Sequence, residues 1–290
     1  MLSPPEDDVM LPPNIVLDPL LTAWLQEDIG RGDLTTLGLG TLAHQAGKAV
    51  WVAKAPGVVV GLPVAQRVFQ LLAPSTEFEA LVPEGTYCEA GTAIASLNGN
   101  LETLLMGERV ALNLAMRLSG IGTLTRTYVD IIADTPARLV DTRKTTPGLR
   151  ILEKYATWVG GAINHRMGLD DAVMIKDNHI AAAGGIQAAV QQMRQHMPYP
   201  LTIEVETETL EMVQAALAAE VDIIMLDNMS PALMEQAVSL IRKTHGHVKI
   251  EASGNITLET LRSVAATGVD YISTSAPITR SAWLDLSMRI

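Results

Sequence analysis

The stretch LTIEVETETLEMVQAALAAEVDIIMLDN, residues 201–228, decides the fold of this chain. Two short apolar runs, 201–206 and 222–228, flank a helically periodic run at 208–220. Each outer run is apolar almost without interruption, as expected for a strand buried on both faces of a parallel sheet. The spacing matches a strand, a crossover helix and a second parallel strand. The stretch therefore predicts one βα unit and the strand that follows it.

The same alternation continues on both sides of this unit. Further strand-like runs occur at 138–143, 172–176, 248–254 and 271–275. Helical runs are predicted between them at 148–160, 185–197, 231–243 and 257–267. Repeated βα units indicate an α/β fold. Six units in series favour a β/α barrel over an open sheet.

Polar residues follow the predicted strands in an ordered way. In a β/α barrel the chemistry lies at the carboxyl ends of the strands. In chain order the six runs end in Arg143 with Lys144, Lys176 with Asp177, Glu206, Asp227 with Asn228, Ser253 with Gly254, and Thr274 with Ser275.

This order of cations, acids and small residues has a chemical interpretation. Clustered cations bind a multiply charged anion. Acids on neighbouring strands hold Mg²⁺ through water or accept hydrogen bonds from sugar hydroxyls. Backbone N–H groups after the last strands cradle a phosphate. His165 and Arg166, in the loop GGAINHRMGLDD, add to the cations. The pattern predicts a site for a phosphorylated sugar, a metal ion and a second anion.

The first part of the chain has a different texture. We expect a helix from Asp18, as its N-cap, to Gly30, and a second helix over 63–73. Short strands are predicted over 48–61 and 76–100. The long periodic run 104–134 predicts a helix that breaks near Gly120. We therefore expect an α+β domain over 1–120, joined by the C-terminal segment 277–290, and a barrel domain over 121–276.

The bulk composition excludes several classes of protein. The formal net charge of −11 argues against a nucleic-acid binder, although a local cleft can still be basic. Cys88 is the only cysteine, so an intrachain disulfide is impossible and a reducing cytoplasm is expected. The N-terminus lacks the pattern of a signal peptide. No apolar run approaches the roughly 20 residues that span a bilayer, so no membrane association is expected.

Six motifs together carry a family resemblance. GERVALNLAMRLSGIGTLT, DTRKTTPGLR, GGAINHRMGLDDAVMIKDNHI, IEVETETLE, IIMLDN and EASGNIT resemble the quinolinate phosphoribosyltransferases. The similarity runs from about Asp18 to LDLSMR near the C-terminus. The resemblance implies an incomplete TIM-like β/α barrel with an N-terminal α+β sandwich domain. It also implies that quinolinate and phosphoribosyl pyrophosphate (PRPP), with Mg²⁺, give nicotinate mononucleotide, pyrophosphate and CO₂ in de novo NAD biosynthesis.

The resemblance also implies roles for single residues. Quinolinate would be bound by Arg143, His165, Arg166 and Lys176. Lys144 would serve quinolinate or pyrophosphate, and Arg109 would reach the partner's site in a homodimer, with a hexamer left open. Glu206 and Asp227 would serve the ribose hydroxyls and Mg²⁺, through water. Lys144, Lys176, Glu206 and Asp227 are the expected catalytic residues. The 5′-phosphate would bind at Ser253, Gly254, Asn255 and Ser275.

One segment departs from the family pattern. The turn usual in the family, VGALT, is TSAPIT here, so that Ser275 replaces a glycine and Pro277 removes an N–H donor. Three other functions stay open on the sequence alone. A related phosphoribosyltransferase, such as the molybdenum-transport-associated homologues, would take another acceptor. An aldolase barrel would form a Schiff base on Lys176. A binding or regulatory protein of the same fold would have no activity.

Overall fold

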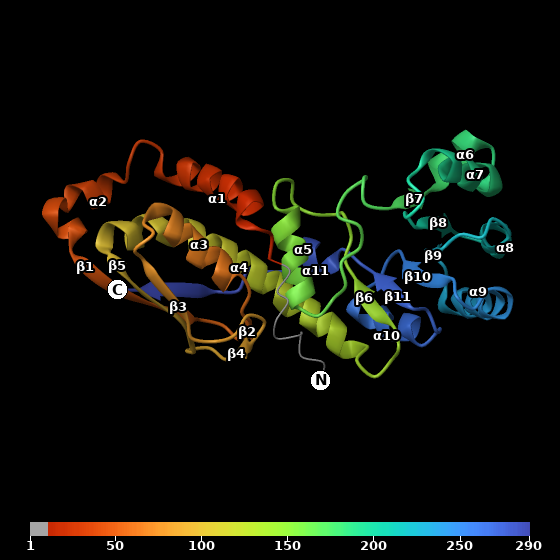
Figure 1. Ribbon diagram of the computed structural model, residues 1–290. Coiled ribbons are helices and arrows are strands. Elements are labelled where there is room, and N and C mark those ends of the chain that lie inside the picture. Colours follow the sequence, from red (N-terminus) through yellow and green to blue (C-terminus); the bar gives the residue numbers. More distant parts are fainter. Residues whose placement is uncertain (1–10) are drawn as a thin grey trace. The chain divides into compact units, whose positions relative to one another are not determined.

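The computed structural model describes residues 11–290, so the first ten positions of the expected 1–120 domain lie outside the described residues. The chain divides into two compact units (Figure 1). Of the described residues, the first contains 11–126, together with Ile151–Gly161 and Arg280–Ile290. The second contains Thr127–Arg150 and Ala162–Thr279.

The second unit is built on a six-stranded sheet with the order β6-β11-β10-β9-β8-β7. These strands are β6 (Arg138–Val140), β7 (Val173–Ile175), β8 (Ile203–Thr207), β9 (Ile223–Asp227), β10 (Lys249–Ser253) and β11 (Tyr271–Ser273). Every neighbouring pair is parallel. Because β6 pairs with β11, the first and last strands are neighbours, and β6 and β7 are left as the two edges. This order confirms an incomplete barrel.

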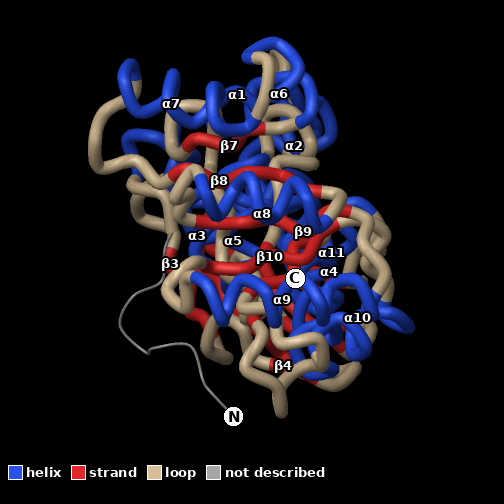
Figure 2. Tube along the Cα trace, turned by 90° about the vertical axis from the view of Figure 1, so that its right-hand side faces the viewer, coloured by secondary structure: helices blue, strands red, loops and turns tan. Residues whose placement is uncertain are grey.

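Helices alternate with these strands along the chain. They are α6 (Asp177–Ala183), α7 (Ile186–His196), α8 (Leu210–Ala218), α9 (Pro231–Thr244), α10 (Leu258–Ala265) and α11 (Ala276–Thr279). Figure 2 shows α8 and α9 in front of β8, β9 and β10. Hydroxyl side chains cap three of these helices, since Thr209, Ser230 and Thr257 each accept a hydrogen bond from a backbone N–H of the first turn. The predicted strands and helices of this region are present, whereas α6 and α11 were not predicted. The strands β7 and β11 end one residue before the predicted ends at Lys176 and Thr274, and β8 ends one residue after Glu206.

The first unit is built on an antiparallel four-stranded sheet with the order β12-β1-β5-β3. Its strands are β1 (Ala46–Ala53), β3 (Glu77–Ala80), β5 (Ala93–Asn100) and β12 (Leu286–Arg289), and β2 (Gly57–Val58) pairs with β4 (Tyr87–Cys88). Its helical elements are α1 (Asn14–Ile29), α2 (Leu34–Gly38), the 3₁₀ turn η1 (Gly40–His44), α3 (Leu62–Leu72), α4 (Leu101–Ile131) and α5 (Arg150–Val159), of which α4 and α5 each cross the division between the units. The C-terminal strand β12 lies beside β1 (Figure 1).

The start of α1 differs from the prediction. The helix begins at Asn14 after Pro13, so Asp18 is not its N-cap. Instead, the Asp18 carboxylate binds the guanidinium of Arg67 on α3, with both N–O distances at 2.7 Å. The side chain that the local pattern predicted as a helix cap therefore forms a long-range ion pair instead. The predicted end of the helix at Gly30 is confirmed.

The long helix α4 is continuous over Leu101–Ile131, so the predicted break at Gly120 is wrong. A Cβ at Gly120 would lie 2.9 Å from the carbonyl carbon of Ala282 and closer still to its oxygen. The glycine is therefore explained by close backbone packing rather than by a break in the helix. Within the described part of the chain, no helix combines the length and the apolar character needed to cross a membrane.

Candidate active site

The cations of the motif DTRK follow β6 in a loop. The strand ends at Val140, so the prediction that Arg143 ends it is wrong. The residue after the strand, Asp141, is 2 % exposed. Its Oδ1 accepts a hydrogen bond from His165 N at 2.8 Å, and its Oδ2 accepts one from Asn164 Nδ2 at 2.7 Å. Arg143 therefore lies beyond a buried acid that fixes where the loop starts.

A second segment carries cations alongside β6. Ile163 forms a parallel bridge with Val140, through Ile163 N to Leu139 O at 2.8 Å and Asp141 N to Ile163 O at 3.1 Å. This segment thus lies on the edge of β6 that pairs with no strand in the described chain. His165 and Arg166 stand two and three positions after Ile163. Burial, and then the charge of Arg143, lower the pKa of Arg166, so the two segments bring like charges together.

Two buried acids face His165. The Nδ1 of His165 accepts a hydrogen bond from Arg166 N at 2.8 Å, so its Nε2 carries the proton and donates to Glu204 Oε2 at 3.1 Å. Glu251 Oε2 lies 3.7 Å from the same nitrogen. The Oε1 atoms of Glu204 and Glu251 are buried without a hydrogen-bond partner among the described residues. Burial, and then the charge of Glu204, raise the pKa of Glu251 to about 7.

This cluster was missed in the sequence, although a signal was present. Glu204 and Glu206 are two positions apart on β8, and side chains two apart in a strand share a face. Glu251 stands two positions before Ser253 on β10 in the same way. Each buried acid therefore lies one layer below a residue that was predicted for the site. The ligand atoms of His165, Glu204 and Glu251 lie within 4.8 Å of one another, close enough to hold one metal ion.

The predicted acids lie at the ends of neighbouring strands. Lys176, the N-cap of α6, places its Nζ 2.5 Å from Glu206 Oε2. Glu206 on β8 pairs with Met225 on β9. Met225 is two positions before Asp227, the last residue of β9. Asp227 Oδ2 accepts a hydrogen bond from Asn228 Nδ2 at 2.7 Å. Carboxylate oxygens are the ligands that Mg²⁺ prefers, and Mg²⁺ usually uses one or two carboxylates and retains several waters. Glu206 and Asp227 are thus of the residue type that could hold Mg²⁺.

The ends of β9 and β10 form one tightly packed turn. Asn228, Gly254 and Asn255 adopt positive φ angles of 54°, 87° and 52°. Asn228 N donates to Ser253 O at 3.0 Å, and Asn255 Nδ2 donates to Asn228 Oδ1 at 3.0 Å. A Cβ at Gly254 would lie 2.8 Å from Asn228 N. The motif EASGNIT thus forms a pre-shaped backbone turn next to Asp227.

Comparisons with known proteins agree with this arrangement. The family models for quinolinate phosphoribosyl transferase match the chain, the C-terminal domain over 121–289 and the N-terminal domain over 33–119. A protein of Synechocystis sp., "Probable nicotinate-nucleotide pyrophosphorylase [carboxylating]", is 62 % identical over 290 residues, covering 100 % of this chain and 98 % of the relative. The chain belongs to the quinolinate phosphoribosyltransferase family.

Two further relatives cover nearly the whole chain. The Bacillus subtilis protein of the same printed name is 44 % identical, covering 96 % of this chain and 94 % of its own. The crystal structure of NadC from Streptococcus pyogenes has a TM-score of 0.91 at 41 % identity, covering 96 % of this chain and 97 % of that one. The family resemblance therefore extends over both units rather than over one motif.

The segment TSAPIT, which departs from the pattern of the quinolinate phosphoribosyltransferase family, follows the end of β11. Thr274 Oγ1 accepts a hydrogen bond from Ala276 N at 3.2 Å, and Ser275 O accepts one from Ile278 N at 3.0 Å. Pro277 is therefore in the first turn of α11, where N–H groups have no partner within the helix. Its missing donor costs the helix nothing but leaves one N–H fewer for a phosphate.

Arg109 lies on α4 in the first unit. Its side chain is 59 % exposed, and the Glu108 carboxylate is 3.9 Å from its guanidinium. An arginine so exposed and so weakly paired is available to a partner surface. The role expected for Arg109 in a partner's site stays a prediction.

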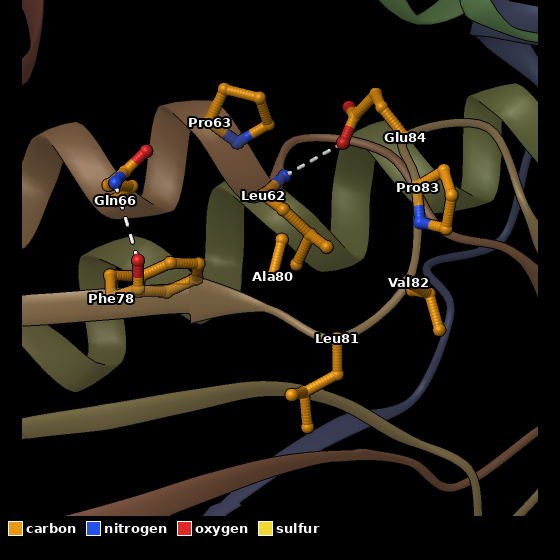
Figure 3. A pocket seen from close by; sticks show the side chains of 9 residues that line it. All are labelled: Leu62, Pro63, Gln66, Phe78, Ala80, Leu81, Val82, Pro83 and Glu84. Atoms are coloured by element: carbon orange, nitrogen blue, oxygen red, sulfur yellow. Dashed lines mark hydrogen bonds between the residues drawn. The ribbon is translucent and has the colours of Figure 1, made fainter.

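The first unit also contains a pocket of about 310 Å³ (Figure 3). Its lining is mostly apolar, and its acid, Glu84, points at the start of α3, where it accepts hydrogen bonds from Gly61 N and, at 3.3 Å, from Leu62 N. Burial raises the pKa of Glu84 to about 7, although these bonds and one from Tyr155 oppose the rise. An apolar pocket with an acid does not suit a dianion. The strand ends of the second unit are therefore the candidate quinolinate phosphoribosyltransferase site.

Proposed function

We propose that the protein transfers the phosphoribosyl group of PRPP to quinolinate with loss of CO₂, giving nicotinate mononucleotide and pyrophosphate for de novo NAD biosynthesis. The observation that carries this proposal is the pairing of two cationic segments, Arg143 with Lys144 and His165 with Arg166, beside β6 in a chain of net charge −11. Both substrates are polyanions. A local concentration of positive charge in an acidic protein is what their binding requires.

Binding orients the acceptor. Arg143, His165, Arg166 and Lys176 hold the two carboxylates of quinolinate, so that the ring nitrogen faces C1 of the ribose. The bond from C1 to the pyrophosphate oxygen breaks, its electron pair leaves with pyrophosphate, and the nitrogen lone pair forms the new bond to C1. Lys144 faces the departing pyrophosphate.

The acids serve the sugar. As the bond to pyrophosphate lengthens, positive charge grows on the ribose ring, and the carboxylates of Glu206 and Asp227 stabilise it. These two residues would also hold Mg²⁺ through water, and Mg²⁺, when bound, supplies positive charge for the leaving pyrophosphate. Lys176 is paired with Glu206 and would keep that carboxylate in place until the substrates arrive. The turn at Ser253, Gly254 and Asn255, with Ser275, binds the 5′-phosphate.

Decarboxylation follows from the product of the transfer. The ring nitrogen is now positive, so the bond from C2 to its carboxylate can break with the electron pair remaining on C2 beside that charge. CO₂ leaves, and a proton from water takes its place on C2. The pyridinium ring is thus its own electron sink.

A product assay tests the proposal. Purified protein is incubated with PRPP, Mg²⁺ and carboxyl-labelled quinolinate, and with nicotinate in a parallel reaction. We expect labelled CO₂ and nicotinate mononucleotide from quinolinate and no product from nicotinate. Well-folded protein that forms no product from quinolinate would refute the proposal. Arg143→Ala should raise the quinolinate KM or abolish turnover, and unchanged quinolinate kinetics would remove Arg143 from the site.

The aldolase alternative is disfavoured by a specific contact. A Schiff-base lysine must present a free amine, whereas Lys176 Nζ forms an ion pair with Glu206. Borohydride reduction in the presence of a carbonyl substrate should therefore leave Lys176 unmodified.

We propose further that the protein works in the cytoplasm as a homodimer, in which Arg109 completes the partner's site. Assembly of such dimers into a hexamer is a second possibility. Arg109→Ala and Lys176→Ala should each be inactive alone. After subunit exchange between equal amounts of the two variants, about half of the dimers are mixed, and each mixed dimer has one of its two sites complete. The mixture should therefore recover about a quarter of the wild-type activity. An active monomer, or no recovery despite proven exchange, would contradict the shared site.

A further inference from the structure

Two like-charged segments lie side by side next to β6. Burial, and then the charge of Arg143, lower the pKa of Arg166, so the approach of the two arginines is unfavourable. The backbone bridge of Ile163 to β6 holds the segments together at one point, and side-chain contacts add to it. Within the second unit, two residues outside the predicted site provide such contacts, one at each end of the segments.

Asp141 binds the start of the second segment. Its carboxylate takes both available donors there, His165 N and Asn164 Nδ2, at 2.8 and 2.7 Å. Asp141 is itself 2 % exposed, and its own N–H donates to Ile163 O. Because Asp141 stands two positions before Arg143, it ties the start of the first cationic segment to the backbone of His165.

Arg150 binds the far ends. Its Nε donates to Thr145 Oγ1 at 3.0 Å and one terminal nitrogen donates to Met167 O at 3.2 Å. The other terminal nitrogen lies 3.5 Å from Arg143 O, at the limit of a hydrogen bond. These acceptors flank the cations on both segments. The guanidinium of Arg150 is therefore directed at protein oxygens.

We propose that Asp141 and Arg150 are positioning residues that clamp the two cationic segments into a single surface for the acceptor's carboxylates. This inference rests on the proposed function. The two contacts are complementary, because a carboxylate binds the donors at one end and a guanidinium binds the acceptors at the other. A planar fork with several fixed donors suits the second task, and a lysine ammonium cannot reproduce it.

The test uses conservative variants with matched controls. Arg150→Lys is compared with Arg242→Lys, because Arg242 also donates to a backbone carbonyl, Val248 O at 2.9 Å, and to an acid, Asp270 at 2.8 Å. Asp141→Asn is compared with Asp222→Asn, since Asp222 accepts a hydrogen bond from Ile203 N at 2.8 Å. Neither control touches the cationic segments. The readouts are the KM values of quinolinate and PRPP and amide hydrogen exchange over residues 162–168.

We expect Arg150→Lys and Asp141→Asn to raise the quinolinate KM about tenfold or more, with the PRPP KM changing less than about threefold. Exchange over 162–168 should accelerate in both. The controls should lower thermal stability without moving the quinolinate KM. Equal changes in both KM values, or an unchanged quinolinate KM in Arg150→Lys, would overturn the clamp. If Asp141→Asn fails to fold, Arg150→Lys decides.

Failure of the clamp is distinguishable from failure of the proposed function. If the wild-type protein releases no CO₂ from quinolinate, the proposed function is refuted. The clamp is then tested by amide hydrogen exchange alone. Faster exchange over 162–168 in Arg150→Lys than in Arg242→Lys supports it, and equal exchange in the two variants overturns it.

Discussion

Gly254→Ala is the sharpest test of the phosphate turn. Gly254 has a φ of +87°, and an alanine Cβ there would lie 2.8 Å from Asn228 N and closer still to the Asn228 side chain. The matched control is Gly184→Ala, because Gly184 has a φ of +83° with no atom within 4 Å of the added Cβ. Both variants carry the same backbone strain, and only the first carries the collision.

The magnitudes follow from these contacts. A residue with a Cβ loses about 1–2 kcal/mol in the left-handed region, which applies to both variants. In Gly254→Ala the backbone of Asn228 must also move, which disrupts its 3.0 Å hydrogen bond to Ser253 O, at a cost of about 1 kcal/mol. We therefore expect Gly254→Ala to lose about 2–3 kcal/mol of unfolding free energy and Gly184→Ala about 1–2 kcal/mol.

The functional difference should be larger than the difference in stability. A displacement of about 1 Å in a positioning element lowers activity by on the order of a hundredfold. The assay is the PRPP dependence of nicotinate mononucleotide formation at saturating quinolinate, with thermal denaturation of both variants. Gly254→Ala should lose kcat/KM for PRPP, whereas Gly184→Ala should retain it. PRPP kinetics that are the same in the two variants would refute the assignment of this turn to the 5′-phosphate.

Three further predictions concern the pH dependence, the fold and the metal. The folded state raises the pKa of Glu251 from 4.5 to about 7, so its contribution to stability is full below pH 4.5 and declines as the pH rises towards 7. In a plot of unfolding free energy against pH, Glu251→Gln should therefore have a smaller slope than the wild type between pH 4.5 and 7. A curve parallel to that of the wild type would contradict this prediction. Gly120→Ala should lower the melting temperature by several degrees, because its Cβ would collide with the Ala282 carbonyl, and an unchanged melting temperature would contradict that packing. Chelation of Mg²⁺ should stop turnover, and Glu206→Gln should raise the Mg²⁺ concentration for half-maximal rate about tenfold, whereas an unchanged Mg²⁺ dependence would exclude Glu206.

The parallel strands could be predicted because burial on both faces of a sheet leaves a direct mark on composition. A strand such as IIMLD has no polar face to obscure its pattern, so its position and its end at Asp227 could both be predicted. The start of α1 could not, because Asp18 meets Arg67, 49 positions away, and a local cap motif says nothing about that partner.

The order of residues along the chain thus determined the βα repeat, the family motifs and the strand ends at Asp227 and Ser253, because each depends on periodicity or on near neighbours. Only the tertiary structure decided that α4 runs through Gly120, that Glu204 and Glu251 meet His165, and that Asp141 and Arg150 tie together two segments of like charge. The reason is the same in each case. These features depend on which distant atoms meet in space, through backbone packing, burial and hydrogen bonding, and no local pattern of residues encodes that distance.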